Sequence, residues 1–170
     1  MSTLLVQNIK HTNGTTAATV DSSGNVHRAG LILQVQSAVL LASSQYSNTS
    51  TSYTDIVSVT ITPKFSSSKI LFQLSGDAGA SGDNTAILLK VVRNINGGSF
   101  SAIGGGGFSY ENNNYNACSL AVMDSPSTTN ACIYKLQGAL STASGTGYFP
   151  TNWSIDSTEG NTITVMEVAQ

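Results

Sequence analysis

Charge is scarce in this sequence. Lys, Arg, Asp and Glu together make up 9% of the 170 residues, and the formal net charge is −2, whereas a typical soluble domain carries roughly 25% charged residues. A chain this close to neutral lacks the basic surface that binds nucleic acid. Because charge normally keeps exposed strand edges apart, we expect that copies of the chain cover one another's edges.

Long apolar runs and helix-forming residues are also few. No window reaches the ~20 apolar residues of a membrane span, so no membrane insertion is expected. The opening stretch MSTLLVQNIK lacks the basic start and long apolar region of a signal peptide, which predicts a protein made and folded in a cytoplasm. Ser, Thr and Asn are abundant where helix builders are few, and they favour turns and caps. The composition therefore predicts an all-β protein.

Residues of common catalytic sites are rare. The two histidines, His11 and His27, lie near the N-terminus, and no zinc-binding spacing joins them to the cysteines. The glycine run at 104–107 lacks the Lys-Ser/Thr of a phosphate-binding loop, so we expect it to be a flexible loop. An inward carboxylate such as Glu167 could be a catalytic acid, but a neighbouring Lys or Arg would satisfy it equally well. We predict that the protein is not an enzyme, has no catalytic residues and binds no cofactor.

Two aspartates, Asp77 and Asp83, are expected in one glycine-rich loop, GDAGASGDN. Carboxylates and carbonyls in such a loop can bind Ca²⁺. Their spacing matches no EF-hand, however, and aspartates are common in surface turns. We therefore predict no metal site.

The two cysteines flank a stretch that reads as a hairpin. Centring this hairpin on Thr128 pairs Leu120 with Leu136 and places Cys118 and Cys132 on one face. They would then lie roughly 20 Å apart at ~3.4 Å per residue, too far for a disulfide. We predict two free, buried thiols.

Alternating apolar residues predict about eight strands after Gly30. Val57, Val59 and Ile61 fall on one face of one strand, and Ile70 begins another such series. Several strands have apolar residues on the second face too, which an isolated sandwich should not show. We therefore expect copies of the chain to pack on one another. The strands are expected at 31–41, 56–62, 69–75, 86–94, 118–124, 132–141 and 161–169.

The first 29 residues differ from the remainder. Their strands are short and joined by Asn-Gly and Ser-Gly turns, so they cannot bury a core alone. We predict an N-terminal arm over 1–29 and a β-sandwich domain over 30–170.

Aromatic residues gather in two stretches, GTGYFPTNWS and FSYENNNYN. Each is expected to be a loop, and exposed aromatics beside Asn can stack on sugar rings. Aromatics are equally common in packing at sheet edges and between subunits. The candidate glycan contacts are Tyr148, Phe149, Trp153, Tyr110 and Tyr115.

The segments LQVQSAVLLASS, TSYTDIVSVTITPKFSSSKILFQLSGD and TITVMEV resemble small phage virion proteins of the tail-fibre or head-fibre type, common in marine phages. LLVQNIKHTNGTTAATVDSSGNV resembles the leader that precedes the globular part of fibre proteins. The resemblance implies an antiparallel jelly-roll-like β-sandwich that assembles as a homotrimer, with the leader attaching it to other virion proteins. The candidate attachment residues are Leu4, Leu5, Val6, Ile9 and Val20.

The function that this resemblance implies is a phage virion structural protein, a tail-fibre or fibre-like module that can contact a host surface glycan. The chain is short for a complete fibre, so a capsid-decoration or head-fibre protein that stabilises the shell is an open alternative. A free-standing carbohydrate-binding module is an alternative of another class. A capsule-degrading hydrolase is a third, and would require paired carboxylates in a groove.

Overall fold

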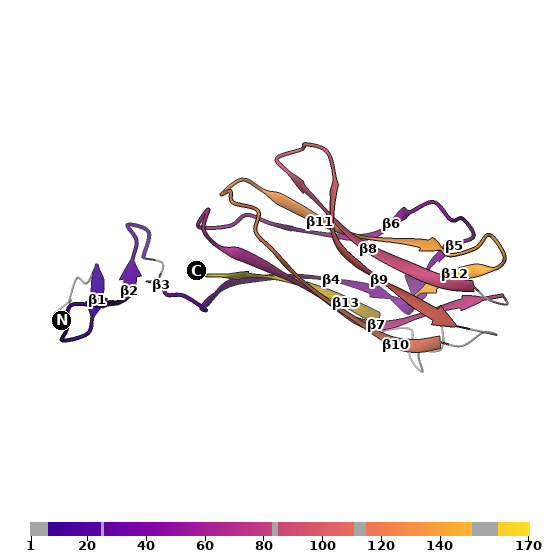
Figure 1. Ribbon diagram of the computed structural model, residues 1–170, viewed down its shortest axis with the longest axis horizontal. Coiled ribbons are helices and arrows are strands. Elements are labelled where there is room, and N and C mark those ends of the chain that lie inside the picture. Colours follow the sequence, from indigo (N-terminus) through magenta and orange to yellow (C-terminus); the bar gives the residue numbers. More distant parts are fainter. Residues whose placement is uncertain (1–6, 25, 83–84, 111–114, 151–159) are drawn as a thin grey trace.

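The structure is a computed structural model, and it describes residues 7–24, 26–82, 85–110, 115–150 and 160–170. This part of the chain consists of β-strands and one short 3-10 helix, Ala42–Ser44. Figure 1 labels the strands in chain order. They are β1 (Asn8–Lys10), β2 (Thr16–Val20), β3 (Val26–His27), β4 (Ile32–Leu41), β5 (Tyr46–Asn48), β6 (Thr54–Ile61), β7 (Lys69–Ser81), β8 (Thr85–Ile95), β9 (Ser101–Tyr110), β10 (Tyr115–Asp124), β11 (Cys132–Leu140), β12 (Thr146–Phe149) and β13 (Gly160–Val168).

Eight of these strands form two facing antiparallel sheets. One sheet has the order β4-β13-β7-β10, and the other has the order β6-β11-β8-β9. Counted one to eight along the chain, the orders are 1-8-3-6 and 2-7-4-5, which is the strand order of a jelly roll. The short strands β12 and β5 extend the first sheet beside the far end of β7. The predicted all-β, jelly-roll-like sandwich is thus confirmed.

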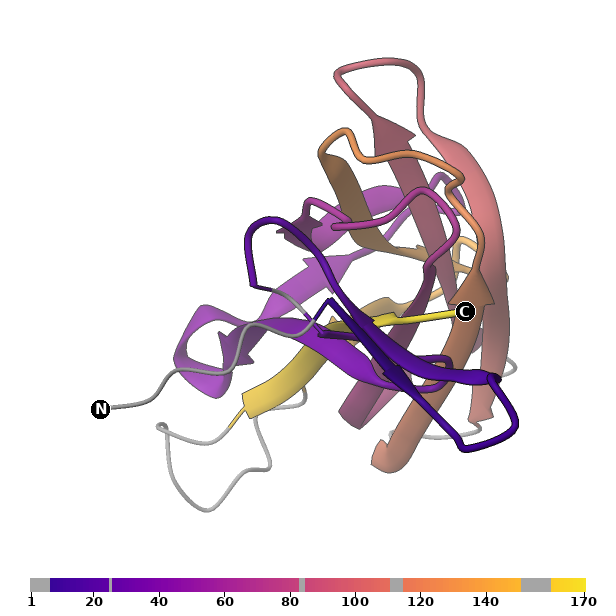
Figure 2. The ribbon, with the colours of Figure 1, turned by 90° about the vertical axis from the view of Figure 1, so that its left-hand side faces the viewer.

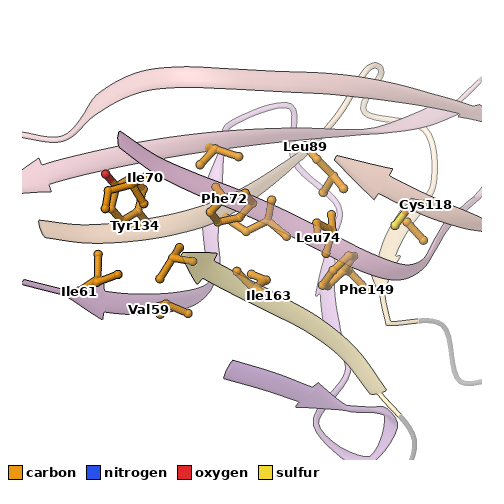
Figure 3. Packing of buried hydrophobic residues seen from close by; sticks show 14 of the residues in the cluster. Val59, Ile61, Ile70, Phe72, Leu74, Leu89, Cys118, Tyr134, Phe149 and Ile163 are labelled. Carbon is orange, nitrogen blue, oxygen red and sulfur yellow. The ribbon is translucent and has the colours of Figure 1, made fainter. Parts of the chain in front are cut away.

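The hydrophobic core lies between the two sheets (Figure 3). Ile70, Phe72 and Leu74 point inward from β7, as their alternation predicts, and Val59 and Ile61 point inward from β6. Full burial of one such side chain contributes about 1.5–3 kcal/mol to the free energy of folding. Burial of the alternating apolar residues therefore explains why the two sheets pack face to face. The other large members of the core are Ile87, Leu89, Val91, Tyr134, Leu136, Phe149, Ile163 and Val165.

The glycine run at 104–107 lies in strand β9, so the expectation of a flexible loop was wrong. β9 pairs along β8 with a register shift between Val91 and Val92. A β-carbon on Gly105 would lie 2.7 Å from the Leu89 carbonyl oxygen, closer than such atoms approach in proteins. The glycines therefore let β9 fit tightly against its neighbour and supply the eighth strand.

The expected hairpin between the two cysteines does not form. β10 pairs with β7 in the first sheet, whereas β11 pairs with β6 and β8 in the second. The connection between them crosses from one sheet to the other, because each strand buries its apolar face only by facing the opposite sheet. The prediction of two free, buried thiols is nevertheless confirmed, since Cys118 and Cys132 are both unpaired and buried.

Strand β7 continues six residues beyond the predicted end, as far as Ser81. Its neighbour changes along its length, from β13 to β12. At the change, the buried side chain of Asn161 accepts a hydrogen bond from the Asp77 amide at 2.8 Å and donates one to the Asp77 carbonyl at 2.6 Å. Gly76 leaves the space that this amide fills. Asp77 therefore lies in a strand, and its expected place in a loop was wrong.

Strands β1, β2 and β3 form a small sheet of their own, beyond one end of the sandwich (Figure 1). Figure 2 looks at this end, with the small sheet in front. Two hydrogen bonds fix the connection: the Gly30 amide donates to the Ala169 carbonyl at 2.8 Å, and the Ala169 amide donates to the Leu31 carbonyl at 2.9 Å. The end of β13 thus holds the start of β4, and the predicted boundary after residue 29 lies in this connection.

Candidate interaction surfaces

The outer face of the β4-β13-β7-β10 sheet carries a continuous line of apolar side chains. The strand register sets one residue of each strand directly opposite the next. The two members at the sheet edges are about half exposed, at 52% for Val35 and 53% for Met123. We call this line the apolar row, and its members are Val35, Met166, Leu71 and Met123.

Neighbouring positions extend this surface toward the arm. Ile32 lies opposite Val168 on the same sheet, and both Leu31 and Ile32 are exposed. On the other side of the apolar row, the next residues across the sheet are the uncharged Ser37, Thr164 and Gln73. The second faces of these strands are thus apolar or uncharged around the apolar row, as the sequence predicts, and the first charged residue toward the arm is Lys69, opposite Val168. A surface of this kind is typical of a protein contact.

The outer face of the β6-β11-β8-β9 sheet has a different character. Lys135 forms an ion pair with Asp55 at 2.5 Å, and Gln137 donates a hydrogen bond to the same carboxylate at 2.7 Å. These two hydrogen bonds lower the pKa of Asp55. The Lys90 ammonium lies 3.8 Å from the centre of the Tyr53 ring. The polar groups on this face therefore pair with one another, which leaves the first sheet as the better candidate for a contact with another protein.

The N-terminal arm buries very little. Ala18 is its buried apolar residue among those that the structure describes, whereas Ile9 and Val26 are exposed and Val20 is half-buried. A three-stranded sheet with so small a core is marginal in water. Of the candidate attachment residues, Ile9 and Val20 lie in this sheet, and Leu4, Leu5 and Val6 lie outside the described residues.

The structure does not bring all the aromatic candidates to an exposed loop. Phe149 is fully buried in the core and cannot contact a glycan, because its alternation with Tyr148 in β12 points it between the sheets. Tyr148 is half-buried and pairs with Gly79 and Ser47 in the first sheet. The expectation that both residues lie in a loop was therefore wrong.

The remaining aromatic candidates are placed only in part. Tyr110 ends β9 and Tyr115 begins β10, so both backbones lie at the end of the sandwich away from the arm (Figure 1). Trp153 lies outside the described residues. The glycan contact itself stays a prediction.

The Glu167 carboxylate is fully buried and holds the connection between β6 and β7. It accepts hydrogen bonds from the backbone amides of Lys64 at 2.8 Å and Phe65 at 3.2 Å. The Gln34 side chain donates a third hydrogen bond at 2.6 Å. The sequence foresaw the inward carboxylate, but its partners are backbone amides and an amide side chain in place of the expected Lys or Arg. Such a carboxylate anchors a loop and has no access to a substrate.

A second buried polar group links the two sheets. Arg93 of β8 donates to both Asp124 oxygens, at 2.8 and 2.7 Å, and Tyr134 of β11 donates to the same carboxylate at 2.7 Å. Burial, followed by the bond to Asp124, raises the pKa of Tyr134. Asp124 belongs to β10, so this cluster ties the first sheet to the second. Nothing in the sequence spacing marks it, because β8, β10 and β11 are not hydrogen-bonded as one set and the cluster depends on how the two sheets face each other.

The described residues contain no cluster of three or more His, Cys, Asp or Glu side chains that could hold a metal ion. Asp77 lies in β7, and Asp83 lies outside the described part. In that same part, no helix is both long and apolar enough to cross a membrane.

The fold defines the class as a jelly-roll β-sandwich with a small appended sheet, and comparison with solved structures agrees. The chain is similar to one in the structure of the Gx strain of infectious bursal disease virus, with a TM-score of 0.50 and 11% identity over 79% of this chain and 36% of that one. It also matches a chain of the VP2 subviral particle of infectious bursal disease virus, with a TM-score of 0.39 and 10% identity over 98% of this chain and 42% of that one.

The chain thus spans less than half the length of the solved chains that it matches. At such low identity the likeness concerns the fold alone. No protein-family model matches the sequence, and no curated protein matches it.

Proposed function

We propose that this chain is a structural protein of a virus particle, a jelly-roll module that assembles with copies of itself and with other virion proteins. The observation that carries the proposal is the apolar row, which crosses all four strands on the outer face of one sheet. A monomer rarely leaves such a surface uncovered, and a neutral face is suited to packing against another protein. The jelly-roll fold, found also in a chain of a virus structure, supports the viral setting.

The N-terminal arm is the proposed attachment segment. Its small sheet exposes Ile9 and Val26 and buries little else than Ala18. It lies beyond the sandwich (Figure 1), where it can insert into another virion protein without disturbing the core. Docking of these exposed side chains would supply the burial that the arm lacks.

The particular role that we propose is a phage tail-fibre or fibre-like module, assembled as a homotrimer as the sequence resemblance implies. With the arm at the particle, the opposite end of the sandwich points outward. The backbones of Tyr110 and Tyr115 and the half-buried Tyr148 lie at that outward end. Aromatic side chains there would suit a contact with a host surface glycan.

Labelling of intact particles tests this proposal. A short epitope tag in the exposed turn at Gly97 and Gly98, which connects β8 to β9, would be located by gold-conjugated antibody on purified particles of the virus that encodes the chain. Label on the tail is the expected result, whereas label over the capsid would select the decoration role. Particles that carry no label, while the tagged protein is abundant in the infected cell, would overturn the proposal. Untagged particles are the control.

A further inference from the structure

Strand β4 is an edge strand whose central part lacks the features that usually protect an edge; its register shift against β13 lies at its start, between Ile32 and Gln34. Among the described strands it pairs with β13 alone. Its ten residues, ILQVQSAVLL, include no charged residue and no proline. Natural proteins protect exposed edges with lysine, proline, bulges or a covering segment. An unprotected edge of this length has backbone amide and carbonyl groups that can pair with a further strand.

The outward side chains of β4 form a palindrome. Val35 lies opposite Met166 and Val39 lies opposite Thr162, which places both on the outer face of the sheet. From Val35 to Val39 the outward residues are Val, Ser and Val, with Ser37 at the centre; toward the start of β4 a register shift interrupts the alternation, and Ile32 lies opposite Val168. Val35 and Val39 are exposed almost equally, at 52% and 54%.

A palindromic edge strand matches a second copy of itself. When two antiparallel copies meet at Ser37, Val35 of each lies opposite Val39 of the other. A shift by one residue would set outward residues opposite inward ones, and a shift by two residues would set Val35 opposite Ser37. An interface around a twofold axis requires this self-complementarity, because the same patch serves both partners.

We infer that β4 is a self-association edge: two copies of the chain pair antiparallel through β4, with Ser37 on the twofold axis. Pairing joins the two β4-β13-β7-β10 sheets into one continuous sheet, in which the end of each apolar row, Val35, lies beside Val39 of the other copy. The arm lies beyond the end of the sandwich (Figure 1). The contact is twofold, so it adds to a threefold assembly by joining subunits of different trimers, and it does not depend on the virion role.

Cysteine cross-linking tests the register directly. Residues directly opposite in an antiparallel pair have α-carbons about 4.5–5.5 Å apart, within the range of a disulfide. Ser37→Cys is therefore expected to give a covalent dimer on mild oxidation. Ser75→Cys, on the same outer face but in the central strand β7, is the matched control and should stay uncross-linked. Ser119→Cys, in the opposite edge strand β10, reports whether the other edge pairs instead.

Charge substitution tests the same register without a covalent bond. In Val35→Lys/Val39→Lys, lysines of the two copies lie directly opposite one another and repel. In Val35→Glu/Val39→Lys, each glutamate lies opposite a lysine of the partner. We expect the first variant to weaken self-association at least tenfold in sedimentation analysis and the second to retain it. Thr60→Lys, at an exposed position in β6, the edge strand of the other sheet, should leave association unchanged.

The outcomes are distinct. A Ser37→Cys cross-link together with retained association of the Glu/Lys variant supports the β4 edge. A protein in which Ser37→Cys gives no more cross-link than Ser75→Cys, or in which the two charge variants associate equally, overturns it. A stable trimer without the Ser37→Cys cross-link would reject the β4 contact while leaving the proposed virion role in place, since that role is decided by the particle labelling.

Discussion

Gly104 in β9 lies so close to Val122 in β10 that a β-carbon at position 104 would be 2.6 Å from a Val122 methyl carbon. The two strands belong to different sheets, so this contact marks the edge where the two halves of the sandwich come together. The glycine is required by the close approach and not by an unusual backbone angle, since φ at Gly104 is not positive.

Gly104→Ala is therefore expected to destabilise the fold. The added methyl group must displace Val122 or part the sheets, and overpacking of this kind typically costs about 1–3 kcal/mol. Gly106→Ala is the matched control, because a β-carbon at Gly106 meets no atom within 4 Å. Urea unfolding of both variants measures the difference in free energy of unfolding. Equal stability of the two variants would contradict the close approach of β9 and β10.

The sequence predicts the strands of this fold better than their partners. Alternation identifies the inward faces of β6, β7 and β13 because each has one face buried in a core. It does not reveal which strand lies beside which, since a strand buries its apolar side equally well in either sheet. For that reason Leu120 and Leu136 seemed to pair in a hairpin, although they lie in different sheets.

Three features of the structure could not be predicted from the sequence. The glycine run in β9 carries no side chains and so leaves no alternation to detect. The apolar row depends on the register of four strands that are distant in the chain, so the apolar second faces could be predicted but not their alignment. Phe149 was misplaced because its neighbours Gly147 and Pro150 suggest a loop.

The cluster around Asp124 should contribute to stability through the hydroxyl of Tyr134. Tyr134→Phe removes one hydrogen bond from a buried hydroxyl to a partly buried carboxylate that keeps Arg93 as its partner, and we expect a loss of about 1–3 kcal/mol. Tyr53→Phe is the control, because it keeps the exposed ring that lies under Lys90. Denaturant unfolding should show a clear shift for the first variant alone; equal shifts would mean that Tyr134 contributes only its ring.

Substitution of Glu167 should lower the stability of the fold. In Glu167→Gln the new amide places a donor beside the Gln34 amide that now donates to the carboxylate, and it weakens the charge-assisted bonds to the loop backbone. The expected loss is about 1–3 kcal/mol. Asp55→Asn makes the same chemical change at an exposed ion pair, where about 0–1 kcal/mol is expected. Thermal unfolding compares them, and a Gln variant as stable as the Asn variant would contradict the anchoring role.

Stability should decrease in alkaline solution because of a buried thiol. Burial raises the pKa of Cys118 from 9.0 to about 12, so above about pH 9 the unfolded chain releases a proton that the folded chain retains. The free energy of unfolding then falls with rising pH, by at most about 1.4 kcal/mol per pH unit for one group, and levels off above the folded pKa. Tyr134, whose pKa is also raised, adds to the decrease.

Replacement of the thiol separates these contributions. Cys118→Ser has no group that titrates in this window at position 118, so the fall in unfolding free energy with pH should become shallower, whatever its stability at neutral pH. Chemical unfolding in reducing buffer, measured at steps from neutral to strongly alkaline pH, gives the slopes for both proteins. Because a serine hydroxyl in an apolar site lowers stability at every pH equally, only the slope bears on the thiol. Identical slopes would show that Cys118 ionises as freely in the folded sandwich as in the unfolded chain.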